Sequence, residues 1–237
     1  MPPALTPRPL LLLNCYLSGD PCPALFTPPL GVRAKVVKVP HVPLDSLVID
    51  LADYRGLVIT GSAASVLDEA SWSLFLEELI REAHSASIPL FGVCYGHQLI
   101  AKALFGPEQV RRSPTPEFGW YKIHVTTPEG PVASAPNPFL CFLSHYDEVT
   151  APRTDELQVL AHSERCGVQA FRVANKPIWG VQFHAEMDFD EAVSIFQERV
   201  ENSPELGIDA DAHVASAVST RELWRAIYGS FLDSLPA

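Results

Sequence analysis

The chain has 237 residues, 47% of them hydrophobic and 19% charged, a composition typical of a globular protein rather than a disordered one. Its formal net charge is −11, from 17 Lys and Arg against 28 Asp and Glu, and no basic cluster offsets it. Because an acidic surface repels phosphate backbones, we expect no nucleic acid partner.

The cysteine pattern indicates neither a disulfide framework nor a metal site. The five cysteines are widely spaced, without a CxxC pair or Cys/His ligand spacing, so we expect no metal and a reducing, cytoplasmic setting. These cysteines are Cys15, Cys22, Cys94, Cys141 and Cys166.

The N-terminal region contains a short apolar run with two possible interpretations. Residues 10–13 follow Arg8 and resemble a signal peptide, but the run is brief and Asn14 interrupts it. We therefore predict a buried strand over residues 10–16. No stretch approaches the roughly 18 apolar residues of a membrane-spanning helix, so we expect no membrane association.

Predicted strands and helices alternate in the first half of the chain. Short apolar runs predict buried strands, and apolar residues that recur every three or four positions predict helices. The strands are expected at 10–16, 32–39, 57–60 and 88–93, and the helices around 72–80 and over 95–105. This alternation favours an α/β fold with a mostly parallel, twisted sheet and helices on both faces.

The second half of the chain changes to short β runs joined by turns. These are expected at 122–126, 157–161, 168–173 and 178–183, followed by helices around 192–200 and 223–231 with a polar break at 203–211. We find no internal repeat and no low-complexity tract. We therefore predict that residues 1–237 form a single domain with an additional short β region.

Residues 92–96 read Gly-Val-Cys-Tyr-Gly, the small-x-nucleophile-x-small pattern of a nucleophile elbow. The turn from strand to helix is so tight that its neighbours must be small, which pushes the side chain of Cys94 out at the carboxyl edge of the sheet. The unpaired N–H groups and the dipole of the helix favour thiolate over thiol there. A buried cysteine in an ordinary turn explains a lone motif of this length about equally well.

A candidate general base stands at the end of the predicted strand 178–183. His184 ends that strand, so it is expected at the same sheet edge as the elbow, where open α/β sheets place their sites. Glu186 is two residues further on and can orient the imidazole by accepting a hydrogen bond. Alone, a strand-end histidine is more often a surface or capping residue, but the elbow makes His184 the favoured base.

Four motifs, in this order, give the chain a family resemblance. They are Thr-Gly-Ser-Ala-Ala-Ser-Val at 60–66, Gly-Val-Cys-Tyr-Gly-His-Gln at 92–98, Ser-His-Tyr-Asp-Glu-Val at 144–149 and Gln-Phe-His-Ala-Glu-Met at 182–187. The chain is similar to the class I, triad-type glutamine amidotransferases, especially the amidotransferase domain of GMP synthetase and its stand-alone relatives. The combination is far more specific than one short pattern.

The resemblance implies a flavodoxin-like fold and an activity that needs no cofactor. Cys94 would attack the γ-amide of glutamine, His184 would carry the proton, Glu186 would orient His184, and a γ-glutamyl thioester would form and be hydrolysed. The backbone N–H groups implied for the oxyanion hole are those of Gly61 or Ser62 and of Tyr95. The residues that match substrate-contacting positions are Gln98, Ser144, His145 and Asp147.

Two positions depart from the family pattern. The family's His-Pro-Glu is His-Ala-Glu at 184–186, which keeps both functional side chains. The doubled glycine of the family's oxyanion loop is Gly61-Ser62, so the geometry there depends on the backbone angles of Ser62.

Three functional hypotheses remain open at this point. The first is an amidotransferase component that hands ammonia to a synthetase partner, since the chain contains no Gly-rich ATP loop followed by Lys. The alternative is a free-standing γ-glutamyl peptidase or hydrolase that acts on γ-glutamyl peptides or conjugates. The third is a redox sensor in which Cys94 is oxidised, which the pairing of His184 with Glu186 disfavours because a sensor needs no ordered base.

Overall fold

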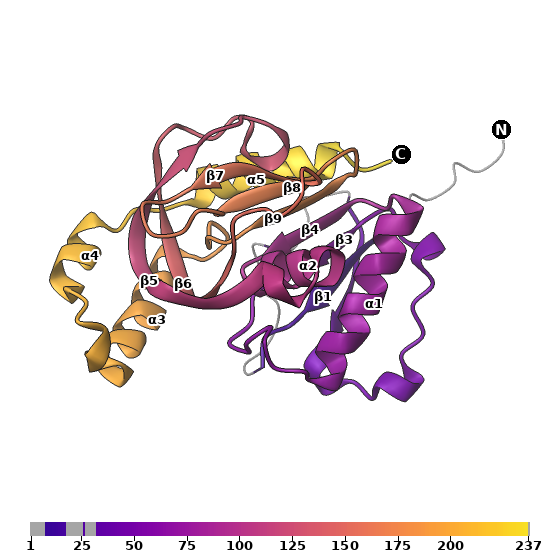
Figure 1. The fold of residues 1–237 in the computed structure, drawn as a ribbon, viewed down its shortest axis with the longest axis horizontal. Helices are drawn as coiled ribbons and strands as arrows, with labels where there is room; N and C mark the ends of the chain where they lie inside the picture. Colours follow the sequence, from indigo (N-terminus) through magenta and orange to yellow (C-terminus); the bar gives the residue numbers. More distant parts are fainter. Residues whose placement is uncertain (1–7, 18–25, 27–31, 237) are drawn as a thin grey trace.

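The computed structural model describes residues 8–17, 26 and 32–236, and the strands within these residues form one nine-stranded sheet (Figure 1). The strand order is β2-β1-β3-β4-β9-β8-β7-β5-β6. Cys22 lies outside the described residues. The sheet has a parallel half and an antiparallel half, which are built mainly from the two halves of the chain.

The parallel half of the sheet comes from short, largely apolar segments. Its strands are β1 (Leu10–Asn14), β2 (Ala34–Lys38), β3 (Leu57–Ile59), β4 (Leu90–Val93) and β9 (Ile178–Val181). Adjacent strands in this group pair in parallel. All five residues of β1 are buried, as expected for a strand that is covered on both faces.

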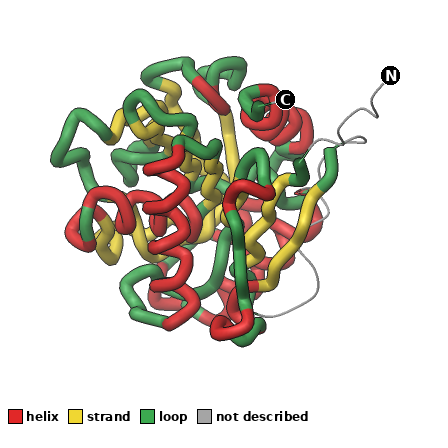
Figure 2. Tube along the Cα trace, turned by 90° about the vertical axis from the view of Figure 1, so that its right-hand side faces the viewer, coloured by secondary structure: helices red, strands yellow, loops and turns green. Residues whose placement is uncertain are grey.

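Helices cover the two faces of this parallel half (Figures 1 and 2). Leu11 and Leu13 pack in one core cluster with α1 (Ser71–Ala86) and α2 (Tyr95–Phe105). The alternate residues of the same strand, Leu10 and Leu12, pack in a second cluster with α5 (Arg221–Asp233). The period of two along a strand therefore sends successive leucines to different helical layers. The predicted α/β class with helices on both faces is confirmed.

The antiparallel half continues the same sheet beyond β9. Its strands are β8 (Ala170–Val173), β7 (Leu157–His162), β5 (Val110–Val125) and β6 (Phe139–Val149). The predicted additional β region is thus present, but β5 is much longer than the run expected at 122–126. β6 lies where no strand is predicted. The register between β5 and β6 shifts between Arg112 and Glu117, a segment that contains two prolines.

A third layer covers the outer part of β5 and β6. It contains α3 (Phe189–Asn202) and α4 (Ala210–Ser216), which lie together at one end of the molecule in Figure 1. Phe196 of α3 packs edge-on against Trp120 of β5 at 5.8 Å between ring centroids. His213 of α4 accepts a hydrogen bond from the backbone N–H of Trp120 at 3.2 Å. The sequence predicts α3 but not α4, which begins inside the expected polar break.

Short 3₁₀ helices occupy several connections. They are η2 (Val39–His41), η3 (Leu44–Ser46), η4 (Leu51–Asp53), η5 (Pro107–Gln109), η6 (Gly130–Val132) and η7 (Pro204–Leu206). In the described part of the chain, no helix combines the length and apolar character needed to cross a membrane.

Candidate active site

The turn at Cys94 has the backbone strain of a nucleophile elbow. Cys94 caps the N-terminus of α2 with φ 48° and ψ −100°, a region that side-chain-bearing residues rarely adopt. Such strain costs roughly 1–3 kcal/mol and persists where surrounding structure enforces it. The backbone N–H of Cys94 donates to the carbonyl of Val181 at 2.8 Å, so β9 holds the strained turn in place.

Neighbouring backbone atoms lie so close to Gly92 and Gly96, the two glycines of the elbow motif, that neither position has room for a side chain. A Cβ atom on Gly92 would lie 2.5 Å from the backbone carbon of Gly96. A Cβ atom on Gly96 would lie 2.4 Å from the carbonyl oxygen of Ile59. Since these neighbours are backbone atoms, they have little freedom to move, and only glycine fits at either position.

His184 and Glu186 form a buried pair just beyond β9. His184 Nδ1 lies 2.6 Å from Glu186 Oε1, and Glu186 is fully buried. The backbone N–H of His184 donates to the carbonyl of Phe142 at 2.8 Å, which fixes this segment against β6. With Nδ1 directed at the carboxylate, the imidazole keeps Nε2 for a second partner.

Cys94 and His184 meet around Gly61. A Cβ atom on Gly61 would lie 3.0 Å from His184 Cε1 and 3.6 Å from Cys94 Cβ. Burial lowers the pKa of His184, but the charges on Glu186 and Cys94, together with hydrogen bonding to both, outweigh burial and raise this pKa well above its usual value. The imidazolium form is therefore favoured between a carboxylate and a sulfur.

The loop that carries Gly61 and Ser62 is anchored at the ends of β1 and β3. The buried Thr60 hydroxyl accepts a hydrogen bond from the backbone N–H of Cys15 at 2.9 Å and donates to the Gly61 carbonyl at 3.0 Å. Among the described residues, Ser87, Cys94 and Asn175 are the non-glycine residues with positive φ, so Ser62 carries no such strain. A serine is therefore compatible with the loop backbone at this position.

The far end of this loop is tied to α2. Lys102 Nζ donates to the carbonyl of Val66 at 2.8 Å and pairs with Glu77 Oε1 of α1 at 3.0 Å. The side chains of Lys102 and Glu77 are only 10% and 8% exposed. The helix that begins after Cys94 is thus connected directly to the loop at 60–66.

A pocket of about 450 Å³ opens at Cys94, a volume within the usual range of small-molecule sites. Its walls combine the candidate nucleophile with the loop at 62–65, α2, β5, β6 and α3. The predicted site residues that line it are Ser62, Cys94, Gln98, Ser144, His145 and Asp147.

The carboxylate of Asp147, a predicted substrate contact, has two side-chain partners. Its Oδ2 accepts a hydrogen bond from Ser65 Oγ at 2.6 Å, and its Oδ1 pairs with Arg112 Nη1 at 2.9 Å. Gln98 Nε2 donates to the Asp147 backbone carbonyl at 2.7 Å and to Gln182 Oε1 at 2.9 Å. The Asp147 carboxylate is therefore fixed and charge-balanced at the pocket wall.

His145 has both ring nitrogens engaged inside the protein. Nδ1 lies 2.9 Å from the Asp147 carbonyl, and Nε2 lies 3.0 Å from Glu117 Oε2. Glu117 is fully buried and also accepts hydrogen bonds from Ser163 and Gln169. This network holds the segment that carries Ser144 and Asp147. His145 lines the pocket, but both of its ring nitrogens already have partners within the protein.

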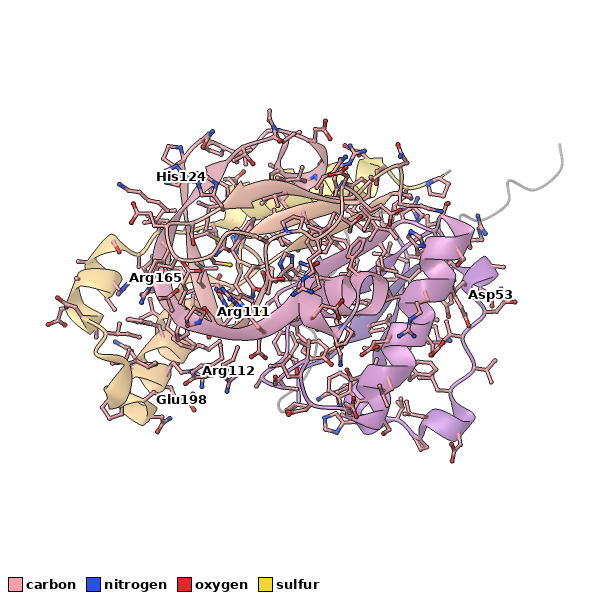
Figure 3. All side chains as sticks on the ribbon, in the orientation of Figure 1. Asp53, Arg111, Arg112, His124, Arg165 and Glu198 are labelled. Atoms are coloured by element: carbon pink, nitrogen blue, oxygen red, sulfur yellow. The ribbon has the colours of Figure 1, made fainter. Side chains whose placement is uncertain are left out.

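Sequence reasoning misses several pocket residues. Arg112 lies in a proline-containing stretch that resembles a loop, and Arg199 lies on the polar side of a predicted helix. Figure 3 shows Arg112 on the side of the molecule where Glu198 of α3 also lies. The pocket residues that no predicted motif contains include Leu17, Asp68, Arg112 and Arg199, and Ser65 and Tyr146 lie in predicted motifs without a predicted role of their own.

The remaining cysteines of the described chain lie outside the pocket. Cys15, Cys141 and Cys166 are buried, and Cys141 and Cys166 are in no disulfide. Burial raises the pKa of Cys166 to about 12 and that of Cys141 well above its usual value, so both are thiols near neutral pH. Among the described residues, no group of three or more His, Cys, Asp or Glu side chains is arranged to hold a metal ion.

Comparisons with known proteins give the same family along most of the chain. Residues 28–201 match the family model of glutamine amidotransferase class-I. A glutamine-hydrolyzing GMP synthase component from Methanocaldococcus jannaschii is 32% identical over 163 residues, 68% of this chain and 79% of that protein. The corresponding protein from Methanococcus vannielii is 43% identical over 109 residues, 46% of this chain and 56% of that protein, so that match spans about half of its length.

Solved structures share the fold at lower sequence identity. A glutamine amidotransferase from Thermotoga maritima has a TM-score of 0.77 and 21% identity, and the match covers 95% of this chain and 97% of that one. A glutamine amidotransferase from Methylobacillus flagellatus has a TM-score of 0.74 and 24% identity, with 97% and 96% covered. These similarities confirm the predicted fold class.

Proposed function

Since this chain belongs to the class I glutamine amidotransferase family, we propose that it hydrolyses the γ-amide of glutamine through a γ-glutamyl thioester on Cys94. The observation that carries the proposal is the meeting of the strained Cys94 turn and the buried His184–Glu186 pair around Gly61. A sulfur nucleophile, a base and an orienting carboxylate together make up the usual apparatus of covalent acyl transfer.

In the first step, the Cys94 sulfur attacks the side-chain carbonyl carbon of glutamine. A carbon–sulfur bond forms, and the electrons of the C=O bond move to oxygen. The backbone N–H of Tyr95, in the first turn of α2, has no intrahelical acceptor and is available to this oxyanion. The N–H of Gly61 or Ser62 approaches from the opposite loop, and one such donor contributes about 3 kcal/mol.

In the second step, His184 protonates the leaving nitrogen. The carbon–nitrogen bond breaks, ammonia leaves, and the γ-glutamyl thioester remains on Cys94. His184 then takes a proton from water, the resulting hydroxide adds to the thioester, and glutamate leaves as the sulfur becomes free again. Glu186 keeps the imidazole oriented and stabilises its charged form throughout.

The substrate would be held at the β6 wall of the pocket. The carboxylate oxygens of Asp147 each have a lone pair beyond their bonds to Ser65 and Arg112, so Asp147 is the proposed acceptor for the α-ammonium group of glutamine. Ser144 and Gln98 line the pocket beside it. His145 keeps this segment in position through Glu117. These roles follow the family resemblance, and the shared pocket supports them.

Two candidate functions share this mechanism and differ in what happens to the released ammonia or amine. The relatives that are named as components of a glutamine-hydrolyzing GMP synthase suggest a synthetase partner that receives the ammonia. A free-standing γ-glutamyl peptidase or hydrolase is the second candidate. The observation that favours the second is Arg199 on the pocket wall, which gives a γ-glutamyl peptide a charged group to contact beyond the reacting amide.

The test is the release of glutamate from glutamine and from γ-glutamyl peptides by the purified protein. We expect activity that is lost in Cys94→Ala and His184→Ala and retained in Cys166→Ala, which removes a buried thiol outside the pocket. Full activity in Cys94→Ala would refute the mechanism. A low rate on glutamine that rises with a synthetase partner would favour the amidotransferase version.

A further inference from the structure

Two arginines approach the same aromatic ring on the pocket wall. The guanidinium of Arg112 lies over the ring of Tyr146 at 4.7 Å from the centroid, and that of Arg199 lies over the same ring at 5.4 Å. Both side chains line the pocket that contains Cys94. Like charges that are brought this close are stable only where negative charge or a polarisable surface compensates them.

The positive charge of Arg112 is balanced by a carboxylate of the protein. Its Nη1 pairs with Asp147 Oδ1 at 2.9 Å, and Asp147 also binds Ser65. The charge of Arg112 is therefore already matched by the carboxylate at the pocket wall.

Arg199 differs from Arg112 in its partners. Its guanidinium also lies over the ring of Phe118, again at 5.4 Å, so aromatic rings contact it from β5 and β6. Within the residues that the structure describes, no carboxylate forms an ion pair with Arg199, and this residue is half-buried. Aromatic contacts stabilise the face of a guanidinium but leave the N–H groups at its edge without acceptors.

The aromatic pair also limits the motion of Arg199. Tyr146 is tethered through its hydroxyl, which lies 3.3 Å from Ser203 Oγ just beyond the end of α3. Phe118 is buried and packs edge-on against Tyr146 at 4.8 Å between ring centroids. A planar donor fork held by stacking loses little entropy when it binds an anion.

We propose that Arg199, stacked on Phe118 and Tyr146, is a subsite that binds a carboxylate group of the γ-glutamyl substrate. This inference rests on the proposed function, because the pocket must first accept a γ-glutamyl compound at Cys94. The guanidinium edge presents two parallel N–H donors, the geometry that matches a carboxylate. Bound substrate would then supply a carboxylate partner for Arg199, while Arg112 keeps its pairing with Asp147.

The carboxylate has two possible sources in such a substrate. One is the α-carboxylate of the γ-glutamyl half, which glutamine also carries. The other is the carboxylate of the leaving amino acid, which only a γ-glutamyl peptide carries. Four substrates separate these sources: glutamine, its α-carboxamide, γ-glutamylglycine and γ-glutamylglycinamide.

The experiment measures kcat/KM for release of ammonia or of the glycine portion from each substrate. Wild-type protein is compared with Arg199→Met, which keeps an apolar stem on the aromatic rings, and with Arg199→Lys, which keeps the charge without the fork. Arg165→Met is the matched control, because Arg165 also lies over a tyrosine ring but does not line the pocket. Thermal denaturation checks that each variant is folded.

We expect wild type to prefer a carboxylate over its carboxamide at one of the two positions by about 10- to 100-fold, the usual effect of a charged hydrogen bond. Arg199→Met should abolish this preference, Arg199→Lys should retain part of it, and Arg165→Met should leave it intact. A preference at the α-position identifies the first source, and one at the glycine position identifies the second.

Two results would overturn the subsite. One is a wild type that hydrolyses both members of each substrate pair equally, whatever the variants do. The other is an Arg199→Met variant that loses activity by the same factor on all four substrates. These results differ from a failure of the proposed function. In that case the wild-type protein would show no Cys94-dependent release of ammonia or amine from any of the four substrates.

Discussion

His184 Nδ1 lies 2.6 Å from Glu186 Oε1, in a position where the carboxylate is fully buried and the imidazole almost so. The two residues are separated by one alanine, where the family pattern has proline. The close pair shows that alanine at 185 is sufficient for the contact. This pair is the part of the site with the clearest electrostatic consequence, because it affects the protonation of His184.

The first prediction concerns the pH dependence of activity. Since the pKa of His184 is raised well above its usual value, with Glu186 the largest contribution that opposes burial, the imidazolium persists on the alkaline side of neutrality and is lost as pH rises through the folded-state pKa. Glu186→Gln removes the carboxylate charge, so the alkaline limb of kcat/KM should move to lower pH. The activity should also fall, by roughly 10²-fold or more if His184 is the general acid and base.

The measurement is a full pH profile of kcat/KM for wild type and Glu186→Gln. A variant with reduced activity but an unmoved alkaline limb would show that Glu186 acts on packing rather than on the charge of His184.

The second prediction concerns His97, which is buried in the first turn of α2. Burial lowers the pKa of His97 to about 3, and its ring lies 4.8 Å from that of Phe171. Between the two pKa values, His97 is protonated in the unfolded chain and neutral in the folded chain. The free energy of unfolding therefore falls as pH drops from the unfolded-state pKa of His97 towards 3. The slope from this one group is about 1.4 kcal/mol per pH unit.

Chemical denaturation at several pH values from about two units below to about two units above the usual histidine pKa measures this slope. His97→Gln should flatten the acid decline, even if it lowers stability at neutral pH. The same substitution at His41, an exposed residue, is the control. An unchanged slope in His97→Gln would contradict the prediction.

The third prediction concerns the glycines of the elbow. In Gly96→Ala the new methyl group would lie 2.4 Å from the Ile59 carbonyl oxygen, and the backbone has to shift. We expect a loss of stability of several kcal/mol, as is usual for overpacking against backbone. Gly229→Ala in α5 meets nothing within 4 Å and should stabilise the helix by roughly 0.5–1 kcal/mol. Equal stabilities of the two variants would show that the elbow can relax.

The fourth prediction concerns Lys102, which pairs with the buried Glu77 and holds the loop at Val66. Lys102→Met removes the donor to the Val66 carbonyl and leaves Glu77 with only Arg81 as a partner among the described residues. We expect a loss of about 1–3 kcal/mol in stability from the buried groups left unpaired. The release of the loop at Val66 should also lower kcat/KM.

The double variant Lys102→Met/Glu77→Gln distinguishes these effects. Replacement of the Glu77 carboxylate by an amide should recover part of the stability, because the buried charge that lost Lys102 as a partner is removed, but it cannot restore the contact with Val66. Activity that recovers together with stability would mean that Lys102 does not position the loop.

The sequence predicts the parts of this molecule that depend on local pattern and on strand direction. α2 has the predicted bounds, because its apolar periodicity begins at the elbow and ends at Gly106-Pro107. The approach of Cys94 to His184 is predicted from topology, since both follow parallel strands, β4 and β9, that are neighbours in the sheet. No local signal links the two residues.

The missed features depend on long-range pairing. The first part of β5 contains Pro114 and Pro116 and exposed charges, so its sequence resembles a loop, and its pairing with β6 makes it a strand. Arg199 has no special sequence context, and its place in the pocket follows from the packing of α3 on β5 and β6. The support of Asp147 by Ser65 joins two segments that are 82 residues apart.

The most direct test of the proposed mechanism is to search for the acyl intermediate itself. Wild-type protein is mixed with glutamine, quenched in acid within the first turnovers and digested for mass spectrometry. The mechanism predicts a mass increase of one γ-glutamyl group on the peptide that contains Cys94, absent from Cys94→Ala and unaffected in Cys166→Ala. Turnover of glutamine with the Cys94 peptide unmodified, and undiminished in Cys94→Ala, would contradict it.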